Sequence, residues 1–236
     1  IRQRRSNPNG AEDLLSMLLA VQDEETGEGM SDRQLLNEVI TLINAGHETT
    51  ATSLAWTWQL LGTHPAVMSN LQGEVDSLLT EEIASYEQVR SLTYTRRVFD
   101  ESLRLCPPGM GLAPRAALQD DEIDGYYIPK GAILNIAFYF TLRHPEFWEN
   151  PEQFDPDRFL PERVSARPKY AYMPWGAGCH ACIGKNLALM EAVMILSAIA
   201  RRFHVDLLST HPVEIDPRFT LRPKGGIKVK LRKRAQ

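Results

Sequence analysis

One stretch of the sequence decides the fold: Pro174-Trp175-Gly176-Ala177-Gly178-Cys179-His180-Ala181-Cys182-Ile183-Gly184. Three glycines, Gly176 among them, free the backbone there to approach another group closely. Cys182 comes just before a long apolar run that is typical of a buried helix, and a helix N-terminus stabilises negative charge. The pattern therefore favours a thiolate at Cys182 that serves as a metal ligand.

Other chemistries of paired cysteines fit this stretch less well. A zinc site built on Cys179 and Cys182 needs a second Cys/His pair at suitable spacing, and the sequence contains none. A thioredoxin-like pair needs a βαβ context, and covalent haem attachment needs a His after the second cysteine. The three cysteines are an odd number, which argues against a disulfide framework. Cys106 and Cys179 are interpreted as a small buried residue and a loop residue.

Composition places the chain among ordinary globular proteins. It has 236 residues, of which 43% are hydrophobic and 24% charged, and its net charge of −4 gives no reason to expect nucleic acid as a partner. No apolar run approaches the roughly 20 residues of a membrane span, and the first residues do not form a signal peptide. Because no Met begins the chain, we expect it to be part of a longer protein.

A long helix is predicted over residues 31–64. Ser31 and Gln34 match a capping box, and apolar residues follow at helical spacing. Within this helix the stretch Ala45-Gly46-His47-Glu48-Thr49-Thr50 contains residues that disfavour it, since Gly costs about 1 kcal/mol relative to Ala and Thr can bend a helix. Such a conflict indicates either a tight helix crossing or a functional site.

The remaining pattern predicts a mainly α fold with a small β region. Helices are expected at 65–78 and 92–105, a small sheet at 112–137, and an irregular segment at 144–174. A helix over 185–202 is apolar nearly all round, which predicts burial.

The cysteine stretch resembles the cysteine loop of cytochromes P450, Phe-x-x-Gly-x-Arg-x-Cys-x-Gly. The residues on its fixed positions are Trp175, Gly178, His180, Cys182 and Gly184. Trp175 replaces the usual Phe and His180 the usual Arg, while Cys179 stands where Pro is common.

Three further motifs agree with the resemblance in order and spacing. Residues 45–50 resemble the family's oxygen-binding stretch, Glu101-Ser102-Leu103-Arg104 its Glu-x-x-Arg, and residues 154–159 its meander motif. The whole chain, 1–236, then corresponds to the C-terminal half of a single P450 domain and a partial P450 fold. In it, 31–64 is the oxygen-binding helix, 92–105 the Glu-x-x-Arg helix, 112–137 the small sheet, 144–174 the meander, 174–184 the cysteine loop and 185–202 the helix after it.

The resemblance implies roles for individual residues around a haem b. Cys182 is the ligand to haem iron, and in P450s a thiolate ligand favours O–O cleavage. Thr49 holds a water or hydroperoxide by its hydroxyl and Glu48 connects it to solvent, so both are expected to be catalytic. Gly46, with Ala45 beside it, leaves room for oxygen.

Other residues are expected to hold the haem or its loop. Arg115 and His180 match positions that pair with haem propionates, although a solvent-facing loop is an alternative for His180. Trp175 is expected to pack beneath the haem and donate its indole N–H to the thiolate, which raises the iron potential relative to Phe. A buried charged network that holds the cysteine loop in place is expected from Glu101, Arg104 and Arg158.

The function that follows is haem-dependent monooxygenation of an apolar organic substrate by O2. No flavin or iron–sulfur module is visible, so electrons are expected from a separate ferredoxin or reductase. On this chain, the surface expected to dock that partner contains Arg96, Arg97, His180 and Lys185. The alternative for each of these residues is a solvated helix surface without a partner.

Several matters stay open from the sequence. The rival functions are a P450-like peroxygenase or isomerase, which need not keep the acid-alcohol pair, and a non-enzymatic haem-binding protein. The missing N-terminal half is a further expected partner, since only 112–114 and the residues around Ala45 remain to line a substrate pocket. A cytoplasmic location is expected for a bacterial source, with membrane anchoring left open.

Overall fold

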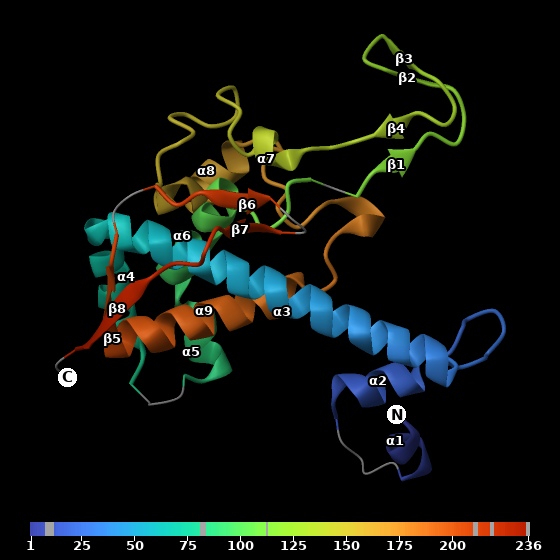
Figure 1. The fold of residues 1–236 in the computed structure, drawn as a ribbon, viewed down its shortest axis with the longest axis horizontal. Helices are drawn as coiled ribbons and strands as arrows, with labels where there is room; N and C mark the ends of the chain where they lie inside the picture. The colour runs from blue at the N-terminus through green and yellow to red at the C-terminus, as the bar shows by residue number, and fades with distance from the viewer. Residues whose placement is uncertain (8–11, 81–83, 112, 210–211, 218–219, 235–236) are drawn as a thin grey trace. The chain divides into compact units, whose positions relative to one another are not determined.

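The computed structural model describes residues 1–7, 12–80, 84–111, 113–209, 212–217 and 220–234. The chain divides into two compact units, residues 1–48 and 49–236, and the boundary falls inside one long helix. Helices make up most of the regular structure, with short two-stranded sheets beside them (Figure 1). The prediction of a mainly α fold with a small β region is confirmed.

The first unit contains α1 (Arg2–Ser6), α2 (Leu14–Ala20) and the first half of α3 (Asp32–Thr63). The predicted capping box begins α3, because Ser31 N donates to Gln34 Oε1 at 3.0 Å and Gln34 N donates to Ser31 Oγ at 3.3 Å. Arg5 ties α1 to this helix start through Asp32 at 2.8 Å. The helix is continuous through residues 45–50, so the residues that disfavour helix there do not interrupt it.

Four helices form the core of the second unit: α4 (Pro65–Leu78), α5 (Tyr86–Ser91), α6 (Thr93–Leu105) and α9 (Lys185–Arg202). Leu71 and Val75 of α4 are fully buried and belong to one apolar cluster with residues of α6 and α9. A second capping box, between Ser85 and Gln88, begins α5. The part of α3 that belongs to this unit, from Thr49 on, adds Leu54 and Leu61 to the same cluster.

The helix after the cysteine loop is buried on one face rather than all round. Leu189, Ala192, Val193, Leu196 and Ala200 are buried, whereas Leu187, Met194 and Ile195 are exposed. The prediction of general burial from the apolar sequence is therefore wrong for this chain. Its described neighbours α4, α5 and α6 cover one side of α9 only, and apolar composition alone does not say where the neighbours lie.

The β region at 112–137 consists of two separate antiparallel ladders instead of one sheet. β1 (Arg115–Ala116) pairs with β4 (Ile133–Leu134), and β2 (Asp121–Ile123) pairs with β3 (Tyr126–Ile128). Asp124 and Gly125 both have positive φ, 51° and 81°, as a two-residue hairpin turn requires. Figure 1 shows β2 and β3 as the tip of an arm whose base is formed by β1 and β4.

Two further ladders follow α9. β5 (Phe203–Leu207) pairs with β8 (Val229–Lys233), and β6 (Ile215–Pro217) pairs with β7 (Leu221–Pro223). The buried indole of Trp56 on α3 donates to Leu221 O at 2.7 Å, which fixes β7 against that helix.

The segment predicted to be irregular, 144–174, contains two short helices, η1 (Pro156–Phe159) and α8 (Pro161–Ala166). A third, α7 (Phe138–Thr141), lies just before it. Its aromatic side chains hold it in place, since Trp148 is buried and packs with Phe159 and Tyr172. A last short turn, η2 (Gly178–His180), lies within the cysteine loop.

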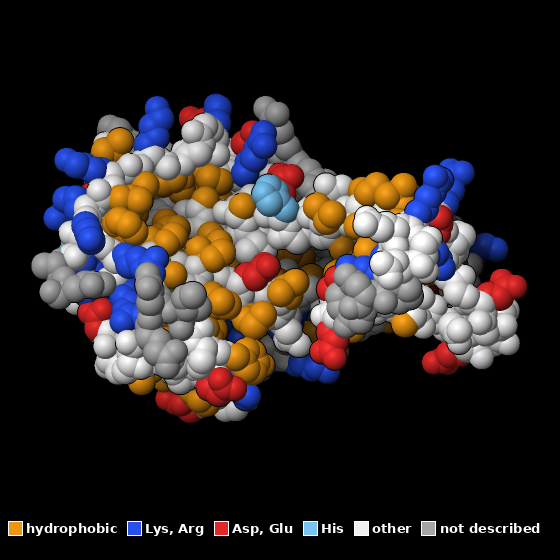
Figure 2. All heavy atoms as spheres, turned by 90° about the horizontal axis from the view of Figure 1, so that it is seen from below, with side chains coloured by type: hydrophobic (Ala, Val, Ile, Leu, Met, Phe, Trp, Pro, Cys, Tyr) orange, Lys and Arg blue, Asp and Glu red, His pale blue; other side chains and the backbone are white. Residues whose placement is uncertain are grey.

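Large hydrophobic side chains remain at the surface. Figure 2 shows a face on which they gather in patches beside lysine and arginine side chains. Among the helices of the described residues, none has the length and apolarity needed to cross a membrane.

The packing of α9 makes a testable prediction. Leu196→Ala should lower the free energy of unfolding by about 2–5 kcal/mol, because it leaves a cavity in a fully buried site. The adjacent Ile195 is 40% exposed, so Ile195→Ala should change the free energy of unfolding by much less than Leu196→Ala does. Urea unfolding followed by circular dichroism measures both. Equal losses would show that the burial of the two faces has been assigned wrongly.

Candidate functional site

The cysteine loop has a backbone that returns on itself. Gly176 and Gly178 adopt positive φ of 71° and 64°, where a side chain would be strained. Cys182 N donates to Trp175 O at 2.7 Å, and Ala181 N donates to Gly178 O at 3.1 Å. These bonds hold Cys182 and Trp175 next to each other although six residues separate them in the chain.

Cys182 presents its side chain to the surface immediately before a helix. It is exposed, and α9 begins three residues later with Gly184 as its N-cap. Lys185 N points back to Cys182 O at 3.4 Å. The predicted position of this cysteine at a helix N-terminus is confirmed, and such a position favours the thiolate that binds metals.

The surroundings of Cys182 fit a haem. The adjacent Ile183 is 91% exposed and Leu187, one turn further, is also exposed, so apolar side chains are available to an apolar ring system. The indole Nε1 of Trp175 is buried without a hydrogen-bond partner among the described residues. A buried donor in this state is costly, and it suits an acceptor supplied by the filled site.

The predicted charged network is present and fully buried. Arg104 binds Glu101 with two hydrogen bonds, Nε to Oε2 at 2.7 Å and Nη2 to Oε1 at 2.8 Å, and Arg158 Nε lies 3.3 Å from Glu101 Oε1. Burial raises the pKa of Glu101, and Arg104 and then the Asp155 amide and Arg158 oppose that rise.

Arg104 also binds the backbone that leads toward the cysteine loop. Its guanidinium donates to Leu142 O at 2.9 Å, Pro151 O at 2.6 Å and Gln153 O at 3.1 Å. Asp155 N donates to Glu101 Oε1 at 3.0 Å. A single ion pair on α6 therefore orders residues 142–158, which the sequence motifs alone did not indicate.

A second anchor of the loop was missed from the sequence. The hydroxyl of Tyr172 lies 3.0 Å from Asp100 O and 3.1 Å from Asp100 Oδ1, and Arg96 Nε donates to Asp100 Oδ2 at 2.8 Å. Burial raises the pKa of Asp100, and the nearby Arg96 charge opposes the rise. The sequence feature that could have indicated this anchor is position. Tyr172 lies three residues before Trp175, and Asp100 directly precedes Glu101.

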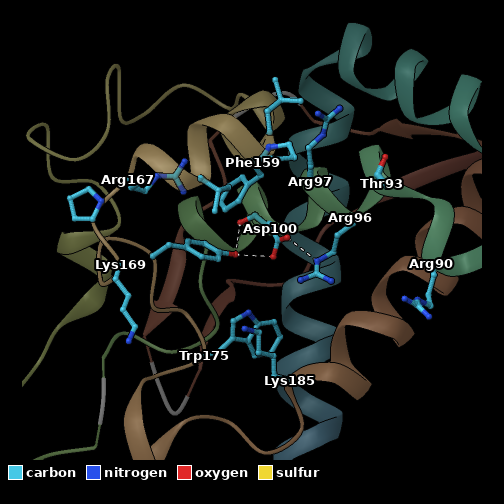
Figure 3. Close-up of a pocket in the computed structure, with 15 residues that line it drawn as sticks. Arg90, Thr93, Arg96, Arg97, Asp100, Phe159, Arg167, Lys169, Trp175 and Lys185 are labelled. Carbon is cyan, nitrogen blue, oxygen red and sulfur yellow. Dashed lines mark hydrogen bonds and ion pairs between the residues drawn. The ribbon is translucent and has the colours of Figure 1, made fainter.

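A pocket of about 910 Å³ opens beside these anchors. Figure 3 shows that its labelled side chains come from α5, α6, the meander and the start of α9, with Trp175 and Lys185 close together. The charged residues of its lining are mostly basic, namely Arg90, Arg96, Arg97, Arg167, Lys169 and Lys185, with Asp100 as the acidic one. Three of the four predicted docking residues lie here, and His180 does not line this pocket.

The stretch predicted to bind oxygen, residues 45–50, lies in α3. Ala45, Gly46 and Glu48 belong to the first unit and Thr49 begins the second. A Cβ added to Gly46 would meet no atom of the described chain within 4 Å. The carbonyl oxygen of Thr49 accepts a hydrogen bond from Ser53 Oγ at 2.8 Å.

The two residues expected at the haem propionates lie on separate elements. Arg115, on β1, is partly exposed and donates to Ala113 O at 2.7 Å and Pro114 O at 3.3 Å. His180 is exposed in η2. Leu112, expected to line a substrate pocket, lies outside the described residues.

The other cysteines differ from Cys182. Burial raises the pKa of the Cys106 thiol to about 12, so it stays protonated, while Cys179 is exposed in the loop. Within the described ranges, no three His, Cys, Asp or Glu side chains gather into a set that could hold a metal ion.

Comparison with known proteins agrees with this geometry. The family model described as Cytochrome P450 matches residues 1–231. The chain is 40% identical over 205 residues to cyclooctat-9-en-7-ol 5-monooxygenase of Streptomyces melanosporofaciens, covering 87% of this chain and 44% of that protein. It is 37% identical over 224 residues to human cytochrome P450 4V2, covering 94% of this chain and 42% of that protein.

A solved structure gives the same result. The crystal structure of the cytochrome P450DA heme domain superposes with a TM-score of 0.93 at 36% identity, covering 99% of this chain and 52% of that one. The chain thus spans about half the length of the relatives it matches. From its cysteine loop, its buried Glu-x-x-Arg network and this match over nearly all of its residues, the chain belongs to the cytochrome P450 family.

Proposed function

We propose that the protein carrying this chain is a haem-thiolate monooxygenase. It inserts one atom of O2 into an organic, apolar substrate and reduces the other to water with two electrons and two protons. The observation that supports this most directly is the exposed Cys182, held beside Trp175 at the start of α9 and linked through its loop to a buried ion-pair network. The Streptomyces relative is named for oxidising cyclooctat-9-en-7-ol, and an apolar substrate class for this protein is consistent with that name.

The cofactor in this proposal is haem b, with Cys182 as the ligand to iron. When bound, the haem with its thiolate ligand supplies the activation of oxygen. Gly176 and Gly178 let the loop backbone turn sharply enough to present the sulfur. Arg115 and His180 bind the propionates, since a guanidinium and a ring N–H can both donate hydrogen bonds to carboxylates.

Protons reach the oxygen side through α3 in this proposal. Thr49 holds a water molecule by its hydroxyl, and Glu48 takes protons from solvent and passes them to that water. Ala45 and Gly46 present no bulky side chain, and this leaves space for oxygen next to the helix.

Electrons come from a separate redox partner, a ferredoxin or a reductase. The pocket with six basic side chains supports an acidic surface on that partner, because complementary charge speeds association. Trp175 and Lys185 in its lining bring the pocket close to the cysteine loop (Figure 3).

Thiolate ligation is tested by the reduced-CO difference spectrum of the haem-loaded protein. The parent protein should show a band at about 450 nm. Cys182→Ser should abolish it, because an alcohol does not replace the thiolate, and Cys179→Ser should leave it unchanged as a matched control. A band at about 450 nm that survives Cys182→Ser would exclude Cys182 as the ligand and overturn the proposed function.

The role of Thr49 is tested by measuring how reducing equivalents divide between product and hydrogen peroxide. Thr49→Ala should increase the share of reducing equivalents released as hydrogen peroxide, with a loss of product of roughly tenfold to a hundredfold, because proton delivery loses its hydroxyl. Thr49→Ser keeps the hydroxyl and should retain most of the product. Oxygen consumption, peroxide and product are measured together. Equal coupling in the alanine and serine variants would contradict the assigned role.

Trp175 is tested through the iron potential. Trp175→Phe should lower the reduction potential, because the indole N–H no longer withdraws charge from the sulfur. The measurement is a spectroscopic redox titration together with the position of the ferrous-CO band. If neither quantity changes, Trp175 does not donate to the thiolate.

A further inference from the structure

A line of buried hydroxyl groups joins α3 to α6. Thr57 Oγ1 lies 2.7 Å from Ser102 Oγ and donates to Ser53 O at 2.8 Å, and Ser53 Oγ donates to Thr49 O at 2.8 Å. Ser53, Thr57 and Ser102 are between 0 and 3% exposed. All four residues belong to the second unit. The line therefore connects the Glu-x-x-Arg helix with the peptide group of Thr49.

The direction of each bond follows from the number of hydrogens. A hydroxyl carries one hydrogen, and that of Thr57 is donated to Ser53 O. Ser102 must then donate its hydrogen to Thr57 Oγ1, across the interface, instead of to a carbonyl of its own helix. The hydroxyls of Ser102 and Thr57 thus form a short chain that ends at Ser53 O, an arrangement in which hydrogen bonds strengthen one another. The Ser53 hydroxyl makes a separate hydrogen bond to Thr49 O, one turn closer to the start of α3.

The α6 end of this line is held firmly. Ser102 lies between Glu101 and Arg104, whose buried ion pair orders residues 142–158. Packing alone would be satisfied by apolar side chains at 57 and 102, and buried hydroxyls are costly unless they are paired. A hydroxyl pair adds a fixed distance and a fixed register between the two helices, which apolar contacts do not.

At the α3 end, the hydroxyls of Ser53 and Thr57 bond to backbone carbonyls of their own helix. The carbonyls of Thr49 and Ser53 each accept a side-chain hydroxyl in addition to their places in the helical backbone. Such back-bonding from position i to the carbonyl of i−4 bends a helix slightly. Two consecutive back-bonds over residues 49–57 thus set the local geometry of α3 at Thr49.

We propose that Ser102, Thr57 and Ser53 are positioning residues that fix the orientation of Thr49 relative to α6. None of them contacts the reacting atoms in this proposal. Their effect passes through the carbonyl of Thr49 and the bend of α3, and it rests on the proposed role of Thr49 in proton delivery.

The experiment uses the complete haem-loaded protein with Thr57→Val, Ser102→Ala and the double variant. Amide hydrogen exchange over residues 49–57, measured by mass spectrometry, should speed up roughly twofold to tenfold in each single variant. The double variant should exchange more slowly than the product of the two single effects predicts, because both remove the same bond. The share of reducing equivalents released as peroxide should rise in parallel.

Two further variants serve as controls. Thr57→Ser keeps the hydroxyl and should restore both readouts. Thr63→Val removes a hydroxyl on the same helix whose bonds to described residues go to carbonyls within α3 and to the adjacent His64. Both readouts should therefore stay at the parent level. Ser102→Ala is the milder of the two bridge variants and keeps the test valid if Thr57→Val does not fold.

The outcomes separate this inference from the proposed function. Unchanged exchange over residues 49–57 overturns the bridge, and faster exchange with an unchanged peroxide share overturns positioning of Thr49. Both results leave the band at about 450 nm intact. Loss of that band in the parent protein would instead overturn the proposed function.

Discussion

Two guanidinium groups share one buried carboxylate, and the order of residues 142–158 depends on that interaction. Glu101, on α6, binds Arg104 of the same helix and Arg158 from η1, with no exposure of the Glu101 or Arg104 side chain. Removing one partner of such a network costs about 3–5 kcal/mol, since the remaining charge is stranded in the core. Because the three backbone acceptors of Arg104 lie in residues 142–153, this charge also organises a segment with little regular structure of its own.

Contacts between aromatic rings and guanidinium groups hold the segment between residues 148 and 172, which leads to the cysteine loop. The Trp148 ring lies beneath the guanidinium of Arg104 at 4.9 Å and that of Arg167 at 3.9 Å from its centroid. Phe159 and Tyr172 pack edge to face at 4.7 Å. These contacts combine apolar burial with attraction between charge and ring face. Tyr172 then binds Asp100, so the chain reaches Trp175 from a fixed point on α6.

Particular residues show how far the sequence could predict the site. Glu101, Arg104 and Arg158 were predicted to meet from the resemblance of their motifs to those of cytochromes P450, and they do. The bonds of Arg104 to backbone carbonyls were not predictable, since any residue can supply a carbonyl. Asp100 and Tyr172 were missed for a similar reason: an Asp and a Tyr 72 positions apart carry no local pattern that joins them.

The sequence by itself determined the start of α3 and the position of Cys182 just before α9, because capping and the helix dipole act over a few residues. Ser31 and Cys182 are the two examples. Tertiary structure alone decided which face of α9 is buried, that the β region separates into ladders, and that Ser102 bonds to Thr57. These outcomes depend on neighbours distant in the chain, and burial, pairing and side-chain hydrogen bonds exist only once those neighbours are in contact.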